Sequence, residues 1–147
     1  MAILVKPERK ELSFLKKIHE NVKTMAFQGH TDTYTEEQLD GLMHKMNQDD
    51  PHFFYRFVYC DGCQAFVSET SWIFDEEIHA YIFSVIVRSD LREAGYGHES
   101  LRLMKEEAKK YGICAFVSEI HDRNAIGEKF LIKEGFQCIY RENNQKR

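Results

Sequence analysis

A short glycine-containing segment between an apolar run and a helix-forming run constrains this chain most strongly. The apolar run, residues 80–87, is rich in β-branched and aromatic residues and predicts a buried strand. The next motif reads Arg92-Glu93-Ala94-Gly95-Tyr96-Gly97. Apolar residues at helical spacing over 101–111 then predict a helix that stops at Gly112. A strand, a glycine loop and a helix start therefore follow one another directly.

This arrangement suits the binding of a phosphate group. The N–H groups of the first helical turn lack partners within the helix, and the positive end of the helix dipole lies behind them. Glycines let the backbone approach an anion closely, and Arg92 adds a positive charge beside it. The segment therefore predicts a phosphorylated ligand, although a glycine turn without a ligand is the alternative.

Two common phosphate-binding motifs fit the segment poorly. A P-loop needs Lys and Ser or Thr after its glycines, whereas His98 and Glu99 follow Gly97 here. The dinucleotide fingerprint is closer, since Glu119 follows at about the right separation, but Ser100 occupies the position of its third glycine. Neither motif is therefore favoured.

A second motif makes the chain resemble a known family. It reads Asn124-Ala-Ile-Gly-Glu-Lys-Phe-Leu-Ile-Lys-Glu-Gly135-Phe136 and predicts a helix that Asn124 opens. With the glycine loop and with Val85 and Val87 before it, this motif resembles the GNAT superfamily of acetyl-CoA-dependent N-acetyltransferases. The resemblance covers residues 85–136 well, with both motifs in the family's order and spacing.

The resemblance implies one α/β domain (α+β, mixed sheet) over residues 1–147, with elements in the order β-α-α-β-β-β-α-β-α-β. In such proteins the strand before the loop and the next strand, here Ile113 to Ile120, splay apart, and acetyl-CoA lies between them. By the match, the residues that line the coenzyme are Val85, Val87, Arg92, Glu93, Ala94, Gly95, Tyr96, Gly97 and Asn124. Arg92 as a solvated charge and Asn124 as a simple N-cap are the alternatives.

The implied reaction moves an acetyl group from acetyl-CoA directly to a primary amine of a small molecule or a protein. The backbone N–H of Val87 would polarise the thioester carbonyl. Relatives often place Glu as the base where Tyr81 stands, and His79 precedes it by two residues, so we expect it on the same strand face. Glu77 is a third candidate base, at the mouth of the acceptor site.

The acceptor site and the leaving group are less well defined. Phe27, Gln28, His30 and Tyr34 fall in the region between the first helices that shapes the acceptor pocket in relatives. Leu131 stands where many relatives have the Tyr that protonates the departing thiolate, and leucine cannot donate a proton. A non-catalytic module that binds acetyl-CoA or CoA is therefore the alternative function.

Periodicity predicts the remaining elements. Residues 2–6 form a first strand, and an apolar stripe from Leu12 through Val22 to Met25 forms a first helix. Thr35 to Gln38 is a capping box that opens a second helix. His52 to Cys60 and Cys63 to Phe74 form strands joined by a two-residue turn, Asp61-Gly62. The polar tail, residues 141–147, is expected to fray.

Composition agrees with these expectations. The 147 residues suffice for one core, and no apolar run is long enough to span a bilayer. The net charge of −4 argues against a nucleic-acid partner, and the start lacks the pattern of a signal peptide. We therefore expect a cytoplasmic protein, monomer or homodimer, without membrane partners.

Cys60 and Cys63 form a Cys-x-x-Cys motif, which zinc sites and thiol oxidoreductases share. A zinc site needs two further ligands, and Cys114 and Cys138 are isolated in separate predicted strands. A redox pair is usually activated by a helix N-terminus, which a hairpin tip does not supply. We expect a structural pair and no metal.

Overall fold

The structure, a computed structural model, describes residues 1–28, 30–121, 124–137, 141–142 and 145–146. The helices are α1 (Ser13–Glu20), α2 (Glu36–Met46), α3 (Tyr96–Lys109) and α4 (Ala125–Lys133). The strands are β1 (Ala2–Val5), β2 (Phe53–Cys60), β3 (Ala65–Asp75), β4 (Ala80–Val87), β5 (Ile120–His121), β6 (Arg141–Glu142) and β7 (Gln145–Lys146). Up to α4 this order is the predicted one, but the strand expected from Ile113 to Ile120 is reduced to an isolated bridge at Val117 and to β5.

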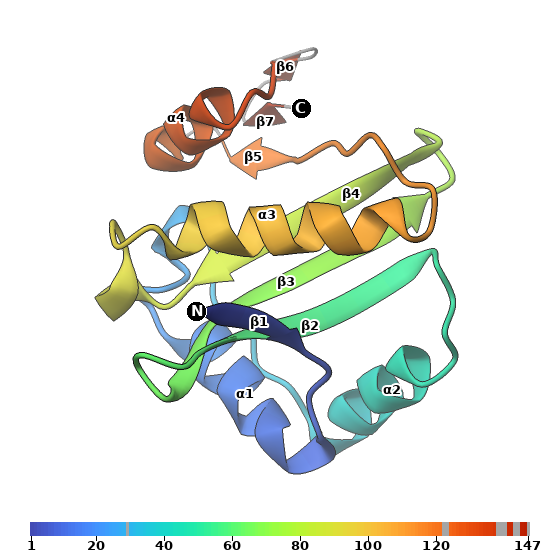
Figure 1. Ribbon diagram of the computed structural model, residues 1–147, viewed down its shortest axis with the longest axis vertical. Helices are drawn as coiled ribbons and strands as arrows, with labels where there is room; N and C mark the ends of the chain where they lie inside the picture. Colours follow the sequence, from blue (N-terminus) through green and yellow to red (C-terminus); the bar gives the residue numbers. More distant parts are fainter. Residues whose placement is uncertain (29, 122–123, 138–140, 143–144, 147) are drawn as a thin grey trace.

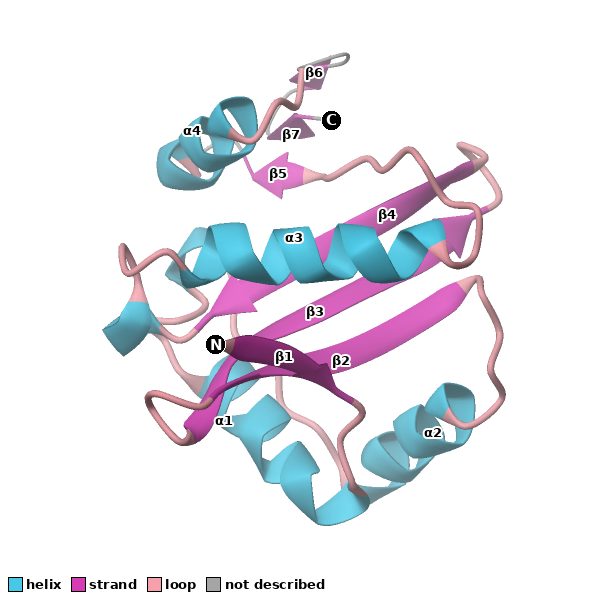
Figure 2. Ribbon diagram, in the orientation of Figure 1, coloured by secondary structure: helices cyan, strands magenta, loops and turns pink. Residues whose placement is uncertain are grey.

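The four longest strands form one antiparallel sheet in the order β1-β2-β3-β4. Its register places Glu69 opposite Phe57 on one side and opposite Ile86 on the other. Beyond β4 the pairing becomes parallel, at the bridge between Ile82 and Val117. The expected α/β fold is thus present as an antiparallel sheet with one parallel bridge at its edge among the described residues, and the helices are arranged around it (Figures 1 and 2).

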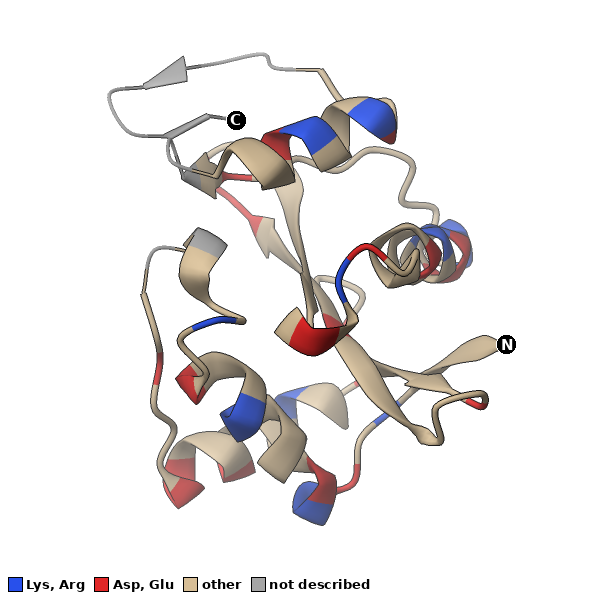
Figure 3. Ribbon diagram, turned by 90° about the vertical axis from the view of Figure 1, so that its left-hand side faces the viewer, with Lys and Arg blue, Asp and Glu red and all other residues tan. Residues whose placement is uncertain are grey.

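Side chains alternate along the strands and give the sheet a separate core on each face. On one face α3 packs over the sheet through Leu101, Met104 and Ala108, against Phe54, Trp72 and Phe83. On the other face α1 and α2 pack over Tyr55 and Phe57, with Leu12, Leu15, Leu39 and Met46. Figure 3 shows α3 apart from the pair α1 and α2, with the sheet between them. The sheet is therefore the layer that positions a site on either face.

The first helix is shorter than its apolar stripe predicts. It ends at Glu20, and Val22 is 75% exposed instead of lying in the core. The carboxamide oxygen of Asn21 accepts a hydrogen bond from the backbone N–H of Thr24 at 2.9 Å. Asn commonly satisfies backbone donors in this way outside a helix, so the turn competes with another helical turn.

The β2–β3 connection also differs from the prediction. The strands pair last at Cys60 and Ala65, so residues 61–64 form the loop and Cys63 is not in the strand. The backbone N–H of Gln64 donates to the carbonyl of Asp61, and Gln64 has a φ of 51°. A turn followed by a left-handed residue is one of the standard longer hairpin loops.

The carboxyl-terminal segments form a second, small sheet in the order β5-β7-β6. Strands β6 and β7 lie in the tail that we expected to fray, where residues 141–142 and 145–146 pair with each other. Among the residues the structure describes, no helix has the length and apolarity needed to cross a membrane.

Helix α4 begins as its sequence motif predicts. The side chain of Asn124 accepts a hydrogen bond from the N–H of Gly127 at 2.8 Å and so caps the helix. A Cβ atom added at Gly127 would overlap the Asn124 carboxamide. Asn124 is therefore an N-cap, and glycine is required at position 127 for this cap to form.

Gly127→Ala should accordingly lower the free energy of unfolding by about 1–2 kcal/mol, because the cap must move or break. Gly41→Ala in α2 is the matched control, since nothing lies within 4 Å of its added Cβ. That exposed helical substitution should raise the free energy of unfolding by about 0.5–1 kcal/mol. Urea denaturation measures both, and equal effects of the two variants would contradict the assigned cap.

Candidate active site

Among the described residues, the outer edge of β4 is paired over only part of its length. The N–H of Phe83 donates to the carbonyl of Val117 at 3.1 Å, and the N–H of Val117 donates to the carbonyl of Tyr81 at 2.9 Å. Backbone groups alternate along a strand, so the N–H and C=O groups of Val85 and Val87 face this same edge. Within the described residues no bridge continues along it, and β5 lies apart from the end of β4 (Figure 1). Backbone groups on this part of the edge can therefore bond a ligand.

The loop after β4 leads directly into α3. Glu93 and Gly95 have φ angles of 66° and 87°, and Gly95 occupies the N-cap position of α3. Tyr96 is the first helical residue, as the sequence predicts for a helix that starts within the glycine motif. A Cβ atom at Gly97 would lie 3.2 Å from the ring of Phe130, so glycine lets α3 approach α4 closely. The first turn of α3, which is partly exposed, thus follows the open edge of β4.

Arg92 ties this loop to the segment after α1. Its guanidinium donates hydrogen bonds to the carbonyl oxygens of Lys23, at 3.2 Å, and Thr24. The hydroxyl of Thr24 also accepts a hydrogen bond from the N–H of Ser89 at 3.2 Å. Arg92, which we expected beside an anion, therefore connects the loop after β4 to the segment after α1.

A pocket of about 370 Å³ opens on the α1 and α2 face of the sheet. Strand β4 contributes Ser84 and Ile86 to its wall, the residues on either side of Val85. Other lining residues come from α1, the segment before α2, β2 and β3, and include Leu15, His19, Gln28, His30, Asp32, Tyr34, Tyr55 and Glu69. The pocket, called the acceptor pocket below, therefore borders the strand whose outer edge is open.

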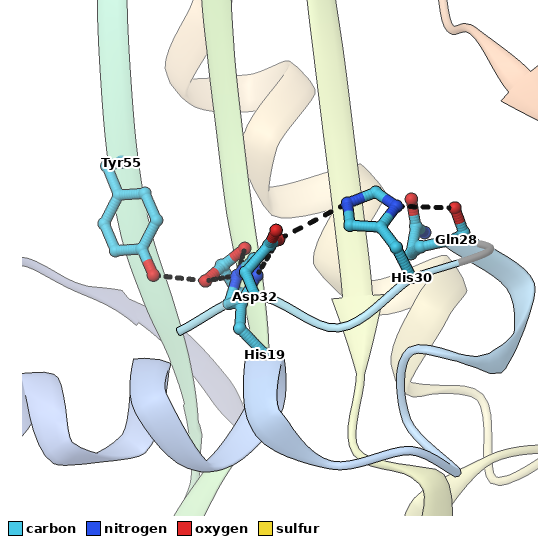
Figure 4. Close-up of polar contacts among 6 residues, drawn as sticks. His19, Gln28, His30, Asp32 and Tyr55 are labelled. Carbon is cyan, nitrogen blue, oxygen red and sulfur yellow. Dashed lines mark hydrogen bonds and ion pairs between the residues drawn. The ribbon is translucent and has the colours of Figure 1, made fainter. Parts of the chain in front are cut away.

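A buried cluster of polar side chains lies in this pocket (Figure 4). Glu69 and His19 are only 3% and 8% exposed, and Nε2 of His19 lies 2.9 Å from a carboxylate oxygen of Glu69. Tyr55 donates its hydroxyl proton to the same carboxylate. On the other side of the ring, Nδ1 of His19 lies 3.3 Å from Asp32, which also approaches His30. His19 thus joins the two acidic residues.

The electrostatics follow from this geometry. Burial lowers the pKa of His19, but its hydrogen bonds to Glu69 and Asp32 and their charges outweigh burial, so the pKa of His19 is raised. Burial, with the charges of Glu69 and Asp32, raises the pKa of Tyr34 to about 12. With His19 protonated, the two carboxylates leave the pocket with an excess negative charge that favours a cation.

The raised pKa of His19 predicts a stability that depends on pH. His19 binds its proton more tightly in the folded state than in the unfolded state. Its contribution to the free energy of unfolding is therefore complete below the pKa of the unfolded state, about 6.5, and is lost as pH rises through the pKa of the folded state. His19→Gln should lower the free energy of unfolding by about 2 kcal/mol near pH 6, and by less near pH 9.

Urea denaturation across this pH range measures the difference between wild type and variant. Val22→Ala, at an exposed position with a side chain that does not titrate, is the control and should give a difference that does not vary with pH. A His19→Gln difference that is constant with pH would contradict the charged pair.

The sequence-based candidates for the base lie elsewhere. His79 is exposed in the turn before β4, with a φ of 52°, so it is not on the strand face that we expected. Its ring packs against Phe74, at 5.2 Å between centroids, and Glu77 is exposed in the same turn. Tyr81 packs with the core on the α3 face. None of the three lines the acceptor pocket.

Most of the residues that we predicted between the first two helices lie at the pocket. Gln28, His30 and Tyr34 all line the pocket, and the backbone of Phe27 lies in the short 3₁₀ helix of residues 26–28. Leu131 is buried in the core between α3 and α4. The structure therefore brings the region after α1 to the open strand, but it leaves the predicted bases at the far hairpin.

Sequence reasoning missed four residues of the buried cluster: His19, Asp32, Tyr55 and Glu69. Some signal was present, because His19 follows Ile18 on the apolar stripe of its helix and Glu69 lies within an otherwise core-forming strand. Buried charged residues are rare unless they are paired. An ionisable residue at each of two positions predicted to lie in the core, here His19 and Glu69, therefore indicates that the two residues pair.

Comparisons with known proteins agree with this geometry. A family model described as the acetyltransferase (GNAT) family matches residues 16–136. No curated protein matches the chain significantly.

Among solved structures, spermidine N-acetyltransferase from Vibrio cholerae, in complex with CoA and spermine, superimposes with a TM-score of 0.79 at 14% identity, covering 99% of this chain and 90% of that one. PaiA N-acetyltransferase from Thermoplasma acidophilum, in complex with coenzyme A, gives 0.75 at 16% identity, covering 99% and 96%. An acetyltransferase from Thermus thermophilus gives 0.76 at 15% identity, covering 99% and 93%. At these identities the superpositions show a shared fold.

Proposed function

The chain belongs to the acetyltransferase (GNAT) family, and from that premise we propose that it transfers an acetyl group from acetyl-CoA to a primary amine. Transfer is direct, within a ternary complex. The coenzyme lies along the open edge of β4, and the amine enters the acceptor pocket on the α1 and α2 face.

The observation that carries this proposal is the position of the pocket relative to β4. Ser84 and Ile86 line the acceptor pocket, while the backbone groups of Val85 and Val87 face the open edge. A thioester held at that edge and an amine held in that pocket would approach each other across a single strand. Holding both reactants at such a point removes much of the entropic barrier to attack.

The coenzyme half of the site uses the loop and the start of α3. The N–H groups near Gly95, Tyr96 and Gly97, at the positive end of α3, would bind the pyrophosphate. Arg92 keeps the loop in place through its bonds to the segment after α1. Glu93, Ala94 and Asn124 complete the set of residues that we assign to the coenzyme. The coenzyme-bound structures named above, which share the fold, support this assignment.

The acceptor half of the site uses the buried cluster. The carboxylates of Glu69 and Asp32 would bind the ammonium form of the amine, since the pocket carries excess negative charge. A raised pKa favours the protonated form of His19, and in that form it is the cation that orients Glu69. We assign the proton acceptor to Glu69 in preference to His79, Tyr81 or Glu77, because only Glu69 lines the pocket.

The chemical step then needs polarisation of the carbonyl and release of the thiolate. The N–H of Val87 would donate to the thioester oxygen as negative charge develops there. The proton that the amine loses passes through Glu69 and water to the departing thiolate, because Leu131 has no proton to give.

Leu131 also supports the second candidate, a module that binds acetyl-CoA without turnover. Its side chain is buried in the core, and a hydrocarbon side chain offers no acid at the position where similar proteins have one. The two candidates share the coenzyme site and differ only in the chemical step.

Turnover separates the two candidates. Purified protein is incubated with acetyl-CoA and a panel of amines that includes spermidine, spermine, simple alkylamines and a lysine peptide, with the matching alcohols as controls. The proposed function predicts release of the CoA thiol together with a mass increase of one acetyl group on at least one amine. Coenzyme binding by calorimetry without release for any amine would support the binding module instead.

A further inference from the structure

The Cys-x-x-Cys motif converges on the start of α3. Cys60 is the last residue of β2, and Cys63 lies in the loop that follows. The hydroxyl of Tyr96 lies 3.4 Å from Sγ of Cys60 and 2.9 Å from Sγ of Cys63. One tyrosine of the glycine motif therefore contacts both cysteines.

Groups of the same loop also favour the thiolate of Cys60. Besides the hydroxyl of Tyr96, the backbone and side chain of Cys63 and the backbone of Gly62 act to lower the pKa of the Cys60 thiol. The hydrogen bond from Tyr96, with these other groups, lowers the pKa of the Cys60 thiol to about 7. Tyr96 and the loop amides thus provide the activation that we did not expect at a hairpin tip.

The two thiols differ in their access to solvent. Cys60 is buried and Cys63 is exposed, and both are free thiols. A reagent from solution reaches Cys63 first, and the sulfurs of Cys63 and Cys60 both contact the same Tyr96 hydroxyl. This is the arrangement of an accessible thiol beside a resolving thiolate.

We propose that Cys60 and Cys63 form a reversible disulfide by exchange with a low-molecular-weight disulfide, and that this bond detaches Tyr96 from the hairpin. In the first step the thiolate of Cys63 attacks one sulfur of the small disulfide, forms a mixed disulfide and expels one thiolate. In the second step the thiolate of Cys60 attacks Sγ of Cys63, forms the protein disulfide and expels the second small thiolate. Two protein thiols and one small disulfide become one protein disulfide and two small thiols, with the two protons passing to the leaving thiolates.

The disulfide changes the surroundings of Tyr96. A disulfide sulfur has no proton to donate and cannot reproduce the bonds of the two thiols to the tyrosine hydroxyl. Tyr96 lies between Gly95 and Gly97, and its ring packs beside Cys60, Val58 and Val67. The expected effect is weaker coenzyme binding in the oxidised protein, and this part of the inference rests on the proposed function.

The test for the disulfide itself needs no coenzyme. Cys114 and Cys138 are replaced by serine, and the protein is incubated with oxidised glutathione at several pH values. Free thiols are counted and intact mass is measured. The expected product has lost both thiols and retains no glutathione, and in the same background Cys60→Ser should keep one glutathione on Cys63. Retained glutathione, or two surviving thiols, in the protein that has both Cys60 and Cys63 would overturn the proposal.

Tyr96→Phe tests the role of the hydroxyl. Without that hydrogen bond the pKa of Cys60 should rise, so the second exchange step should slow by about tenfold near pH 7 and its pH profile should shift upward. Tyr59→Phe is the matched control on β2, since its ring packs against Phe66, and its profile should not move. A Tyr96→Phe profile identical to that of the control would overturn the role assigned to Tyr96.

Coenzyme affinity of the reduced and oxidised forms, measured by calorimetry, tests the consequence. We expect an affinity about fivefold to tenfold lower after oxidation, restored by a dithiol reductant. Equal affinities would overturn the link to Tyr96 and leave the disulfide itself in place. Absence of coenzyme binding in both forms would instead count against the proposed function.

Discussion

Glu69→Gln is expected to lower kcat/KM for the acceptor amine by about 10²–10³-fold. Glutamine has the same shape and can still accept a hydrogen bond from Tyr55, but it carries no charge to bind an ammonium group and takes up no proton. The proposed coenzyme site lies at the open edge of β4, so the affinity for CoA should be unchanged. Steady-state kinetics with varied amine, together with calorimetry for CoA, measure the two quantities separately.

The control is Glu77→Gln, in the exposed turn before β4, which should leave kcat/KM unchanged. This comparison also decides between the base assigned from the pocket and one of those assigned from sequence. Circular dichroism and urea denaturation establish that the Glu69 variant is folded. A folded Glu69→Gln protein with full activity would remove Glu69 from the chemistry, and a loss confined to Glu77→Gln would restore the earlier assignment.

Val87→Pro should lower kcat by about 10²–10³-fold without unfolding the protein, because it removes one backbone donor at the open edge. The N–H of Phe83 faces Val117, so by alternation the N–H of Val87 faces the same side, and the N–H of Arg88 donates to Val67 of β3 at 3.0 Å. Proline is tolerated in a strand where the N–H has no ladder partner. The bonds between β3 and β4 are therefore preserved.

Ile86→Pro is the matched control, one residue earlier. Its N–H faces β3, and Ile86 is buried, so proline there should break the ladder and destabilise the sheet by about 3 kcal/mol or more. Circular dichroism and single-turnover acetylation with saturating acetyl-CoA distinguish loss of fold from loss of chemistry. A folded Val87→Pro protein with unchanged kcat would exclude this N–H as the polarising donor.

The glycine loop and the two helix starts that we assign to the coenzyme could be predicted, because their signals are local. Gly95 and Gly97 follow one strand and open one helix, and Asn124 caps α4 three residues before Gly127. Each of these features depends on a few adjacent residues. Short-range sequence patterns therefore contain most of the information that fixes them.

The polar cluster of the acceptor half, unlike Gln28, His30 and Tyr34, could not be predicted, because its residues meet only after folding. His19 comes from α1 and Glu69 from β3, and their contact depends on how the helix lies across the sheet. The direction of Arg92 likewise depends on the carbonyl oxygens of Lys23 and Thr24, which are remote in sequence. His79 was misplaced because one residue in a left-handed conformation ended the strand alternation on which its assignment depended.

The parallel bridge beside β4 has a consequence for the order in which the protein folds. β2, β3 and β4 are joined by hairpins, so their contacts close short loops, whereas Val117 reaches Ile82 only after the whole of α3 has intervened. Contacts between distant residues cost more loop-closure entropy and form later. We therefore expect the carboxyl-terminal part to dock last, and in the proposed function a pantetheine chain bound between the two parts should raise the melting temperature.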